Sequence, residues 1–487
     1  MDIDHESCYR ALVTRDARFD GLFFVGVATT RIYCRPICSA RTPRADRCRF
    51  FPLAAAAEEA GFRPCLRCRP ELSPGHASVD AVGRLARAAA ARIEAGALDG
   101  GGTLDGLAAE FGLGARQLRR AIGRELGVSP VRLAQTHRLL LAKRLLTETG
   151  MPIIEVALAS GFESLRRFNA LFQSRYRMPP SRFRKSPGAS PARMGLRLRM
   201  AYRPPLAWAE LLGFLRARAI AGVERVVDGG YERVAEFGAH RGWLRVEPGS
   251  AAGCLSVEFA DSLAPALAPL LAGLRHLFDL DARPDAIAAH LAVDGRLGAA
   301  VARCPGLRVP GAFDGFELAW RAILGQRVSV RAATTVAGRL AAGYGEPIEV
   351  GRPGLDRLSP RPERVADAGV EDLAGLGLGR DRASTIKALA RAVADGQLRL
   401  GRGVDAEAAV ARLREIPGIG EWTAQYIAMR ALAWPDAFPH GDLILRRRMG
   451  DPSPSGLREM AEAWRPWRSY AAMHLWNGPT GPDEGGG

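Results

Sequence analysis

The stretches RIYCRPICSAR, residues 31–41, and GFRPCLRC, residues 61–68, each carry a pair of cysteines. Two short-spaced cysteine pairs separated by a loop bring four thiolates to one tetrahedral zinc ion. We therefore expect one zinc ion per chain, held by Cys34, Cys38, Cys65 and Cys68. Disulfides are the weaker alternative, because the sequence suggests no signal peptide or membrane span and eight cysteines in 487 residues fit a reducing cytoplasm.

Positive charge is concentrated in the first 190 residues. Residues 31–70 contain nine arginines against three acidic side chains, and residues 112–190 contain fifteen basic against four acidic ones. Together these segments account for the whole net charge of +16. Such a footprint indicates a polyanionic partner, for which double-stranded DNA is the natural candidate, and no membrane surface is expected. Lysine is scarce, with 3 lysines to 65 arginines.

The hydrophobic pattern and the Pro/Gly-rich breaks predict a multidomain chain, mainly α with α+β parts. Apolar residues spaced three and four apart indicate helices in residues 78–184 and 304–478, and alternating apolar and polar residues indicate strands in residues 196–303. A Pro/Gly/Ser-rich run marks the linker, and the residues after Gly478 are expected to be disordered. The expected segments are a zinc domain (1–76), a helical DNA-binding domain (78–184), the linker (185–195), an α+β domain (196–303) and an all-α domain (304–478).

The second segment contains two helix-turn-helix patterns. A short helix, a glycine turn and an arginine-rich helix fall within residues 104–125, and the pattern recurs within 154–172. A helical bundle with solvated arginines is the alternative for either unit alone, but two units favour DNA binding. The residues expected to contact DNA are Arg116, Arg119, Arg120, Arg166 and Arg167.

The second of these units, with Pro179-Pro180 after it, resembles the AraC-type DNA-binding domain. The cysteine segment closely resembles the zinc domain of the Ada adaptive-response regulators. That resemblance implies irreversible methyl transfer from a DNA methylphosphotriester to Cys34, and a DNA contact by Arg41. A purely structural zinc site is the alternative from the residues alone. The Pro-Cys-His-Arg motif of the methylguanine transferase in Ada does not occur, so that activity is expected to be absent.

Methylation would change the charge of the zinc site. Four thiolates on Zn²⁺ carry a net charge of −2, and methylating one leaves −1, which relieves repulsion from DNA phosphates. The repair event itself is therefore expected to raise operator affinity.

A Pro-Gly-Ile-Gly turn at residues 417–420 separates two expected helices. Gly418 and Gly420 allow the backbone to approach a phosphate, and the free amides of the second helix can bind it. A plain helix–helix turn is the alternative. Asp442 follows at the start of an apolar helical segment, where it is a candidate catalytic carboxylate or simply a helix N-cap.

Residues 195–480 resemble the AlkA-type 3-methyladenine DNA glycosylases of the helix-hairpin-helix superfamily. The resemblance implies that Asp442 is catalytic, and that Gln326 and Arg327 form the wedge that fills the gap left by a flipped base. Two departures affect these roles, since Arg327 replaces a wedge Leu and Leu443 replaces a pocket Tyr. A monovalent cation at the hairpin carbonyls is a further implied ligand. Four aromatic residues are expected to stack on cationic alkylpurines, with core packing as the alternative: Phe214, Trp422, Tyr426 and Trp476.

Trp422 stands where bifunctional relatives carry a lysine, so a monofunctional enzyme is expected. The whole chain is thus expected to be an alkylation sensor and transcription regulator fused to a base-excision enzyme, monomeric and in contact with RNA polymerase. One alternative is a regulator whose glycosylase half only binds DNA. Another is a repair enzyme whose N-terminal half only tethers it.

Overall fold

The computed structural model describes residues 4–74, 84–184 and 195–478. The expected linker, apart from Gly195, and the expected disordered tail after Gly478 lie outside the described residues. The chain divides into two compact units. The first is Met1–Arg203 with Phe237–Arg241 and Pro248–Ala272, and the second is Pro204–Glu236 with Gly242–Glu247 and Gly273–Gly487. None of the described helices is long and apolar enough to cross a membrane.

The zinc segment is built on a four-stranded sheet in the order β3-β1-β2-β4. β1 (Phe24–Val27) pairs antiparallel with β2 (Ile32–Cys34) and with β3 (Cys48–Phe51), and β2 runs parallel to β4 (Arg63–Pro64). Parallel strands end at the same edge of a sheet, so the residues that follow β2 and β4 meet. The helices and 3₁₀ turns here are α1 (His5–Thr14), η1 (Ala17–Phe19), η2 (Ala45–Arg47), α2 (Ala54–Glu59) and η3 (Pro70–Leu72).

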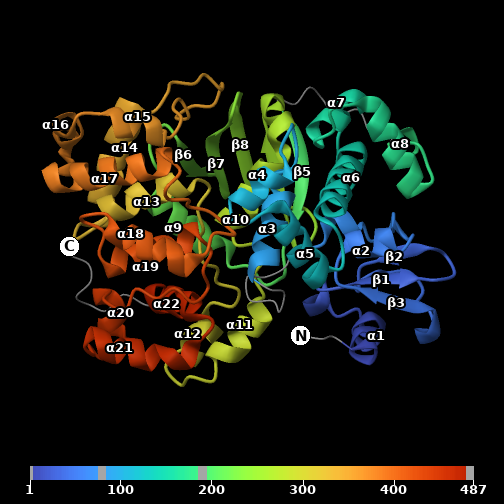
Figure 1. The fold of residues 1–487 in the computed structure, drawn as a ribbon. Helices are drawn as coiled ribbons and strands as arrows, with labels where there is room; N and C mark the ends of the chain where they lie inside the picture. The colour runs from blue at the N-terminus through green and yellow to red at the C-terminus, as the bar shows by residue number, and fades with distance from the viewer. Residues whose placement is uncertain (1–3, 75–83, 185–194, 479–487) are drawn as a thin grey trace. The chain divides into compact units, whose positions relative to one another are not determined.

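Two helix-turn-helix units follow, as the sequence predicts (Figure 1). α4 and α5 form the first unit, α7 and α8 the second, and the long α6 joins them. Ser129 and Ser164 cap α6 and α8 by accepting backbone N–H groups of Arg132 and Arg167. The elements are α3 (Arg84–Glu94), α4 (Leu104–Ala109), α5 (Ala115–Leu126), α6 (Pro130–Glu148), α7 (Ile153–Ala159), α8 (Leu165–Tyr176) and η4 (Pro180–Phe183).

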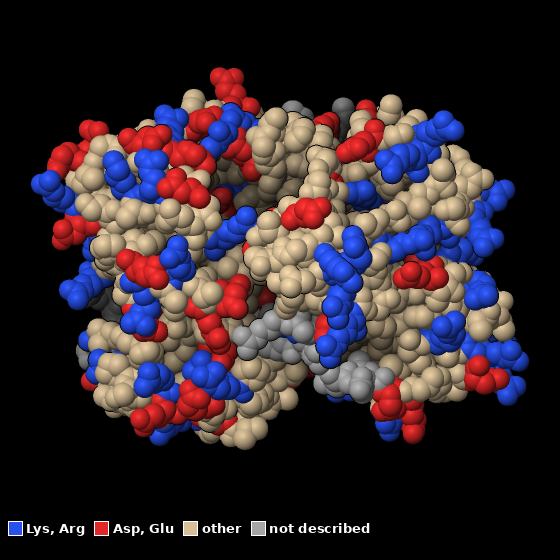
Figure 2. All heavy atoms as spheres, viewed as in Figure 1, with Lys and Arg blue, Asp and Glu red and all other residues tan. Residues whose placement is uncertain are grey.

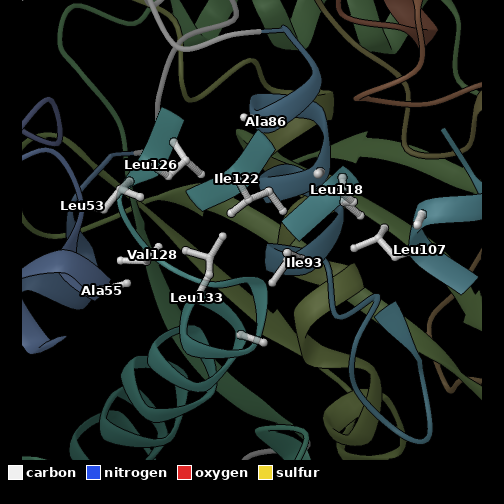
Figure 3. Close-up of a cluster of buried hydrophobic side chains, with 13 residues drawn as sticks. Leu53, Ala55, Ala86, Ile93, Leu107, Leu118, Ile122, Leu126, Val128 and Leu133 are labelled. Carbon is white, nitrogen blue, oxygen red and sulfur yellow. The ribbon is translucent and has the colours of Figure 1, made fainter. Parts of the chain in front are cut away.

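The zinc segment and the first helix-turn-helix unit share one hydrophobic core. Figure 3 shows Leu53 and Ala55, at the start of α2, facing Ile122 of α5 and Leu133 of α6. Each of these four side chains is buried. Because the apolar residues of α2 complete the core of the helical segment, the two segments pack as one body within the first unit.

Polar groups are also buried where α2 meets α6 and α8. The carboxylate of Glu58 accepts hydrogen bonds from Tyr33 Oη (3.1 Å) and Thr136 Oγ1 (2.9 Å), and Arg175 donates to its backbone carbonyl (3.0 Å). Burial raises the pKa of Glu58 to about 7, although these donors and nearby cations oppose the shift. This junction therefore holds a carboxyl group that titrates near neutral pH.

Lys143 of α6 makes a second buried polar contact with the zinc segment. Its Nζ lies 2.6 Å from Glu71 Oε2, and both side chains are 1% exposed. The same ammonium donates to the backbone carbonyl of Cys65, 3.2 Å away. Arg69 lies 3.0 Å from Glu71 and 2.8 Å from Glu148 of α6. The segment from Cys65 to Glu71, which includes two expected zinc ligands, is thus held against α6 by ion pairs and a hydrogen bond.

The α+β segment contains a five-stranded sheet in the order β5-β9-β8-β7-β6. β5 pairs antiparallel with β9 from Leu196 opposite Phe259 to Ala201 opposite Cys254, and β6 pairs antiparallel with β7. The strands are β5 (Leu196–Ala201), β6 (Glu224–Val227), β7 (Gly230–Phe237), β8 (His240–Pro248) and β9 (Cys254–Phe259). The expected mixture of strands and helices is confirmed.

The remaining helices of the described residues lie within and after this sheet segment, and α13 packs against α14, α17 and α19. Trp320 of α13 is fully buried in this helical core. These elements are α9 (Trp208–Ala217), η5 (Asp261–Ala266), α10 (Leu267–Leu277), α11 (Pro284–Leu291), α12 (Gly298–Arg303), α13 (Gly315–Leu324), α14 (Val330–Tyr344), α15 (Pro362–Asp367), α16 (Val370–Leu373), η6 (Ala374–Leu378), α17 (Arg380–Ala394), α18 (Ala406–Glu415), α19 (Glu421–Ala431), α20 (Leu443–Arg448), α21 (Pro454–Met460), η7 (Ala461–Trp464) and α22 (Arg468–Trp476).

Candidate functional sites

The sheet of the zinc segment brings the four expected cysteines together. Cys34 ends β2 and Cys65 follows β4, and the Cys65 amide donates to the Tyr33 carbonyl at 2.9 Å. The sulfurs of Cys34, Cys38, Cys65 and Cys68 all lie within 4.8 Å of one another. A tetrahedral zinc ion with Zn–S bonds of about 2.3 Å needs sulfurs about 3.8 Å apart, so the cluster fits the ion. It is a site for one zinc ion.

Backbone N–H groups are directed at three of the four sulfurs. Arg35 N lies 3.4 Å from Cys68 Sγ, and the amides of Ala40 and Cys68 donate to Cys38 and Cys65. A hydrogen bond withdraws charge from a thiolate and weakens it as a nucleophile. None of these three donors is directed at Cys34.

Most arginines around the cysteines are exposed, but two are ion-paired within the protein. Arg35 is buried and ion-paired with Asp20, and Arg69 is held by Glu71 and Glu148. Figure 2 shows Lys and Arg atoms crowded over the zinc segment and α8, whereas both signs mix over the C-terminal helices. Arg41, the expected DNA contact, is exposed. The exposed arginines between residues 31 and 70 are Arg31, Arg41, Arg44, Arg47, Arg49 and Arg67.

The second helix of each helix-turn-helix unit presents its arginines to solvent. On α5 the apolar face (Leu118, Ile122) is buried, and the opposite face carries the exposed side chains of Arg116, Arg119 and Arg120. On α8, Phe168 and Phe172 are buried while Arg166 and Arg167 are exposed. This is the arrangement a major-groove reading helix requires.

The Pro-Gly-Ile-Gly turn joins α18 to α19 as a tight hairpin. Gly418 has φ = 91°, and a Cβ there would lie 2.1 Å from the Thr385 hydroxyl, so the position requires glycine. Gln326, after α13, donates to the Gly418 carbonyl at 2.9 Å and so fixes the expected wedge segment to the hairpin. Arg327 beside it is exposed with a left-handed backbone (φ = 54°), and Gly420 is the exposed N-cap of α19.

Asp442 is both a helix cap and the acceptor at the centre of an aromatic cluster. Its Oδ1 accepts the Leu445 amide of α20 at 3.0 Å, as an N-cap does. The two indole N–H groups of Trp422 and Trp476 also donate to its oxygens, at 2.9 and 3.1 Å. Three donors thus fix a half-buried carboxylate between α19 and α22. This one geometry is compatible with both roles considered for Asp442, the helix N-cap and the candidate catalytic carboxylate.

The aromatic cluster (Phe214, Trp422, Tyr426 and Trp476) lies around this carboxylate. Trp422 and Tyr426 are stacked with ring centroids 5.2 Å apart and an interplanar angle of 11°, and Tyr426 and Trp476 are 6.2 Å apart at 59°. The Arg430 guanidinium lies 4.8 Å from the Phe214 ring and 5.4 Å from the Tyr426 ring, which links Phe214 to the others. All four rings are partly exposed rather than fully buried in a core.

Sequence reasoning missed the two arginines of the cluster. Arg218 places its Cζ 3.7 Å from the Phe214 centroid, and Arg430 donates to the Tyr426 hydroxyl at 2.7 Å. Burial alone would raise the pKa of Tyr426, but Arg430, Arg218 and Arg321 lower it below its usual value. The signal was available, since Arg218 is four residues after Phe214 and Arg430 four after Tyr426, on the same helix faces.

Four family models match successive parts of the chain. They are the metal binding domain of Ada at residues 7–71, a helix-turn-helix domain at 107–186, the AlkA N-terminal domain at 197–314, and the HhH-GPD superfamily of base excision DNA repair proteins at 320–454.

Curated relatives match the whole chain and its C-terminal half. The probable bifunctional transcriptional activator/DNA repair enzyme AlkA of Mycobacterium tuberculosis is 40% identical over 98% of this chain and 97% of its own length. DNA-3-methyladenine glycosylase 2 of Escherichia coli is 40% identical over 56% of this chain and 95% of its own length. Among solved structures, the 3-methyladenine DNA-glycosylase from Archaeoglobus fulgidus is 22% identical, covers 57% of this chain and 96% of its own, and has a TM-score of 0.49.

Proposed function

The chain belongs to the family of bifunctional transcriptional activator/DNA repair enzymes AlkA, and on this premise we propose that its C-terminal half excises alkylated purines of the 3-methyladenine type from DNA. The observation that carries the proposal is Asp442, a carboxylate fixed by two indole N–H groups beside partly exposed rings. Such a carboxylate is preorganised to face positive charge that develops on a neighbouring sugar.

In the proposed reaction the damaged nucleotide is flipped out of the duplex, and its base stacks on the aromatic cluster. Gln326 and Arg327 fill the gap left in the helix. The bond between C1′ and the base nitrogen breaks, and its electron pair leaves with the base. Asp442 stabilises the oxocarbenium-like sugar, and water adds its hydroxide to C1′ and releases its proton to the solvent, leaving an abasic site. Trp422 at the lysine position of bifunctional relatives predicts that borohydride traps no covalent DNA complex.

The N-terminal half is proposed to accept methyl groups from DNA phosphotriesters at Cys34. Zinc, when bound, keeps its cysteine ligands as thiolates. Cys34 Sγ forms a bond to the methyl carbon, the carbon–oxygen bond to the phosphate breaks, and the phosphate leaves as an ordinary diester anion. The three N–H donors directed at the other sulfurs support Cys34 as the acceptor.

Methylation of Cys34 removes one negative charge and is proposed to strengthen operator binding through α5 and α8. We further propose that the protein contacts RNA polymerase and is monomeric. A cytoplasmic location is also proposed, because a four-thiolate zinc site needs reduced cysteines. Crosslinking to polymerase on operator DNA and a molar mass from light scattering test the first two.

The excision half is tested by incubating the full chain with methylated duplex DNA and measuring released bases. Asp442→Asn should abolish release, because the neutral amide cannot stabilise the sugar cation and opposes one indole N–H with its own N–H. Asp405→Asn is the matched control, since Asp405 also caps a helix, α18, through one backbone N–H. No excision by the parent favours a regulator whose glycosylase half only binds DNA, whereas wild-type excision by Asp442→Asn overturns the role of Asp442.

Peptide mapping of the same sample tests the methyl transfer. The methyl group should appear on Cys34, once per chain, and a methyl on Cys38 or Cys68 contradicts the assignment. An operator footprint should then appear at low salt and weaken as salt rises. A footprint that is equal before and after methylation defeats the charge switch, and no footprint at all favours the tether alternative.

A further inference from the structure

The two oxygens of the Asp442 carboxylate differ in how many donors they accept. Oδ1 accepts the Leu445 amide at 3.0 Å and the Trp476 indole N–H at 3.1 Å. Among the residues that the structure describes, Oδ2 accepts the Trp422 indole N–H alone, at 2.9 Å. A carboxylate oxygen offers about two lone-pair sites, so Oδ1 is filled and Oδ2 keeps one site free. Oδ2 is therefore the oxygen that can turn its charge toward a flipped sugar.

The backbone that carries Trp422 is fixed by the hairpin. Trp422 lies in the first turn of α19, two residues after Gly420, which caps that helix. Gln326 donates to the Gly418 carbonyl at 2.9 Å and to the Thr423 hydroxyl at 2.8 Å, so one side chain joins the hairpin turn to the start of the helix. The helix end whose free amides can face a phosphate thus also carries the indole that contacts the carboxylate.

The ring of Trp422 is fixed from a second direction. It is stacked on Tyr426, with ring centroids 5.2 Å apart and an interplanar angle of 11°. The Tyr426 hydroxyl accepts a hydrogen bond from Arg430 at 2.7 Å, and the buried Arg430 also donates to the carbonyls of Pro310 and Gly311 at 2.7 and 3.3 Å. Because backbone and ring are both held, the indole N–H is aimed at Oδ2 before any substrate binds.

Trp476 contacts the carboxylate in a different way. It ends α22, and its ring lies 6.2 Å from the Tyr426 ring at an interplanar angle of 59°, so the two rings are not stacked in parallel. Its N–H is directed at Oδ1, which the Leu445 amide already fixes as a helix cap. Loss of the Trp476 indole would leave Oδ1 with a donor, whereas loss of the Trp422 indole would leave Oδ2 with none.

We propose that Trp422 is a positioning residue for excision, which aims Oδ2 of Asp442 at the positive charge that develops on the sugar. The inference rests on the proposed excision activity and goes beyond it, because it gives the two tryptophans different roles. Trp422 acts through the carboxylate, and Trp476 acts on the base through its ring. Without the Trp422 N–H, Oδ2 has no donor to fix its direction, so less of the negative charge faces the sugar.

The test measures binding of the full chain to two abasic analogues in otherwise identical duplexes, a cationic pyrrolidine and a neutral tetrahydrofuran. Neither analogue carries a base, so the ratio of the two dissociation constants reports how well the carboxylate meets positive charge at the sugar, independently of base stacking. Trp422→Phe keeps an aromatic ring and removes the N–H. It should lower the preference for pyrrolidine about ten- to hundredfold, and Trp422→Leu, which also lacks the N–H, should do the same.

Two other tryptophans supply matched controls. Trp476→Phe should change the preference by about threefold or less, because the Leu445 amide remains on Oδ1. Trp464→Phe removes an indole N–H from a carboxylate elsewhere in the chain, since Trp464 donates to Asp294 at 2.8 Å, and it should leave the preference unchanged. Thermal unfolding of each variant verifies that the fold is intact.

The outcomes separate this role of Trp422 from the proposed function. If the parent releases no alkylated purine from methylated duplex DNA, the proposed function fails and the role of Trp422 fails with it. If the parent releases the base but binds both analogues equally, or if a folded Trp422 variant keeps the preference for pyrrolidine, the excision activity stands and the role of Trp422 is overturned. A loss with Trp476→Phe or Trp464→Phe as large as with Trp422→Phe also overturns it.

Discussion

Replacing Lys143 by methionine should destabilise the zinc segment and α6 together. The substitution keeps a linear side chain in the buried space but removes the cation that lies 2.6 Å from Glu71 and the donor to the Cys65 carbonyl. Glu71 would stay buried with Arg69 as its remaining partner, 3.0 Å away.

The expected loss follows from these contacts. Removing one partner of a buried ion pair costs about 3–5 kcal/mol. The remaining contact of Glu71 with Arg69 reduces that cost, so we expect a loss of ~2–4 kcal/mol. Neutralising both partners, in Lys143→Met with Glu71→Gln, removes the uncompensated charge. The double variant should therefore be more stable than the sum of the single losses predicts, by ~1 kcal/mol or more.

The placement of tryptophan makes the assay specific. All eight tryptophans follow residue 207, so their fluorescence in a urea titration reports the C-terminal half. Zinc release to a chromophoric chelator in the same titration reports the N-terminal half. Lys143→Met should shift the zinc-release midpoint and leave the fluorescence midpoint unchanged, whereas Arg132→Met, exposed on α6, should shift neither. Additive losses in the double variant, or an unshifted zinc-release midpoint, would refute the coupling.

Three further outcomes are expected from other parts of the chain. The pKa of Glu58 is raised to about 7, so protonated Glu58 stabilises the fold below the unfolded-state pKa, and this stabilisation is lost as pH rises through 7. In zinc-release titrations between pH 5.5 and 8, Glu58→Gln should therefore make the stability of the N-terminal half depend less on pH. Arg166→Ala with Arg167→Ala should reduce the slope of log affinity against log salt by about two, because each arginine accounts for roughly one phosphate contact. Gly418→Ala should destabilise the C-terminal half by more than about 2 kcal/mol, measured by tryptophan fluorescence in urea, because its Cβ meets a threonine hydroxyl at positive φ. Gly420→Ala, where a Cβ meets no atom within 4 Å, is its control.

Local spacing predicted the parts of the sites that depend on local geometry. The two cysteine pairs could be recognised as a zinc site because each pair lies on one turn after a strand. The hairpin could be recognised because Gly418 needs a backbone conformation that only glycine adopts easily. Asp442 could be placed at a helix start from the apolar residues after it, and the same position serves its contacts with Trp422 and Trp476.

The charges within the sites could not be predicted from spacing. Arg35 and Arg69 belong to an arginine-rich stretch, yet the fold buries one against Asp20 and fastens the other to Glu71. Arg218 and Arg430 lie near one ring, Phe214, although the two arginines come from helices far apart in the chain. Composition counts such groups as surface charge, and only tertiary packing decides which of them face DNA or a base.

The contact between α2 and α6 has a consequence for how the protein is made. The ribosome releases the zinc segment first, but the partners of Glu58 and of the Cys65 carbonyl on α6 each come 78 residues later in the chain. Until α6 has emerged, the Glu58 carboxylate and the Cys65 carbonyl lack these hydrogen-bond donors, and the side chains of Leu53 and Ala55 are not fully buried. We therefore expect metal captured before that point to be held less firmly than in the finished protein. On that expectation, the time taken to translate α3 to α6 sets how long a captured ion is held by the incomplete zinc segment alone.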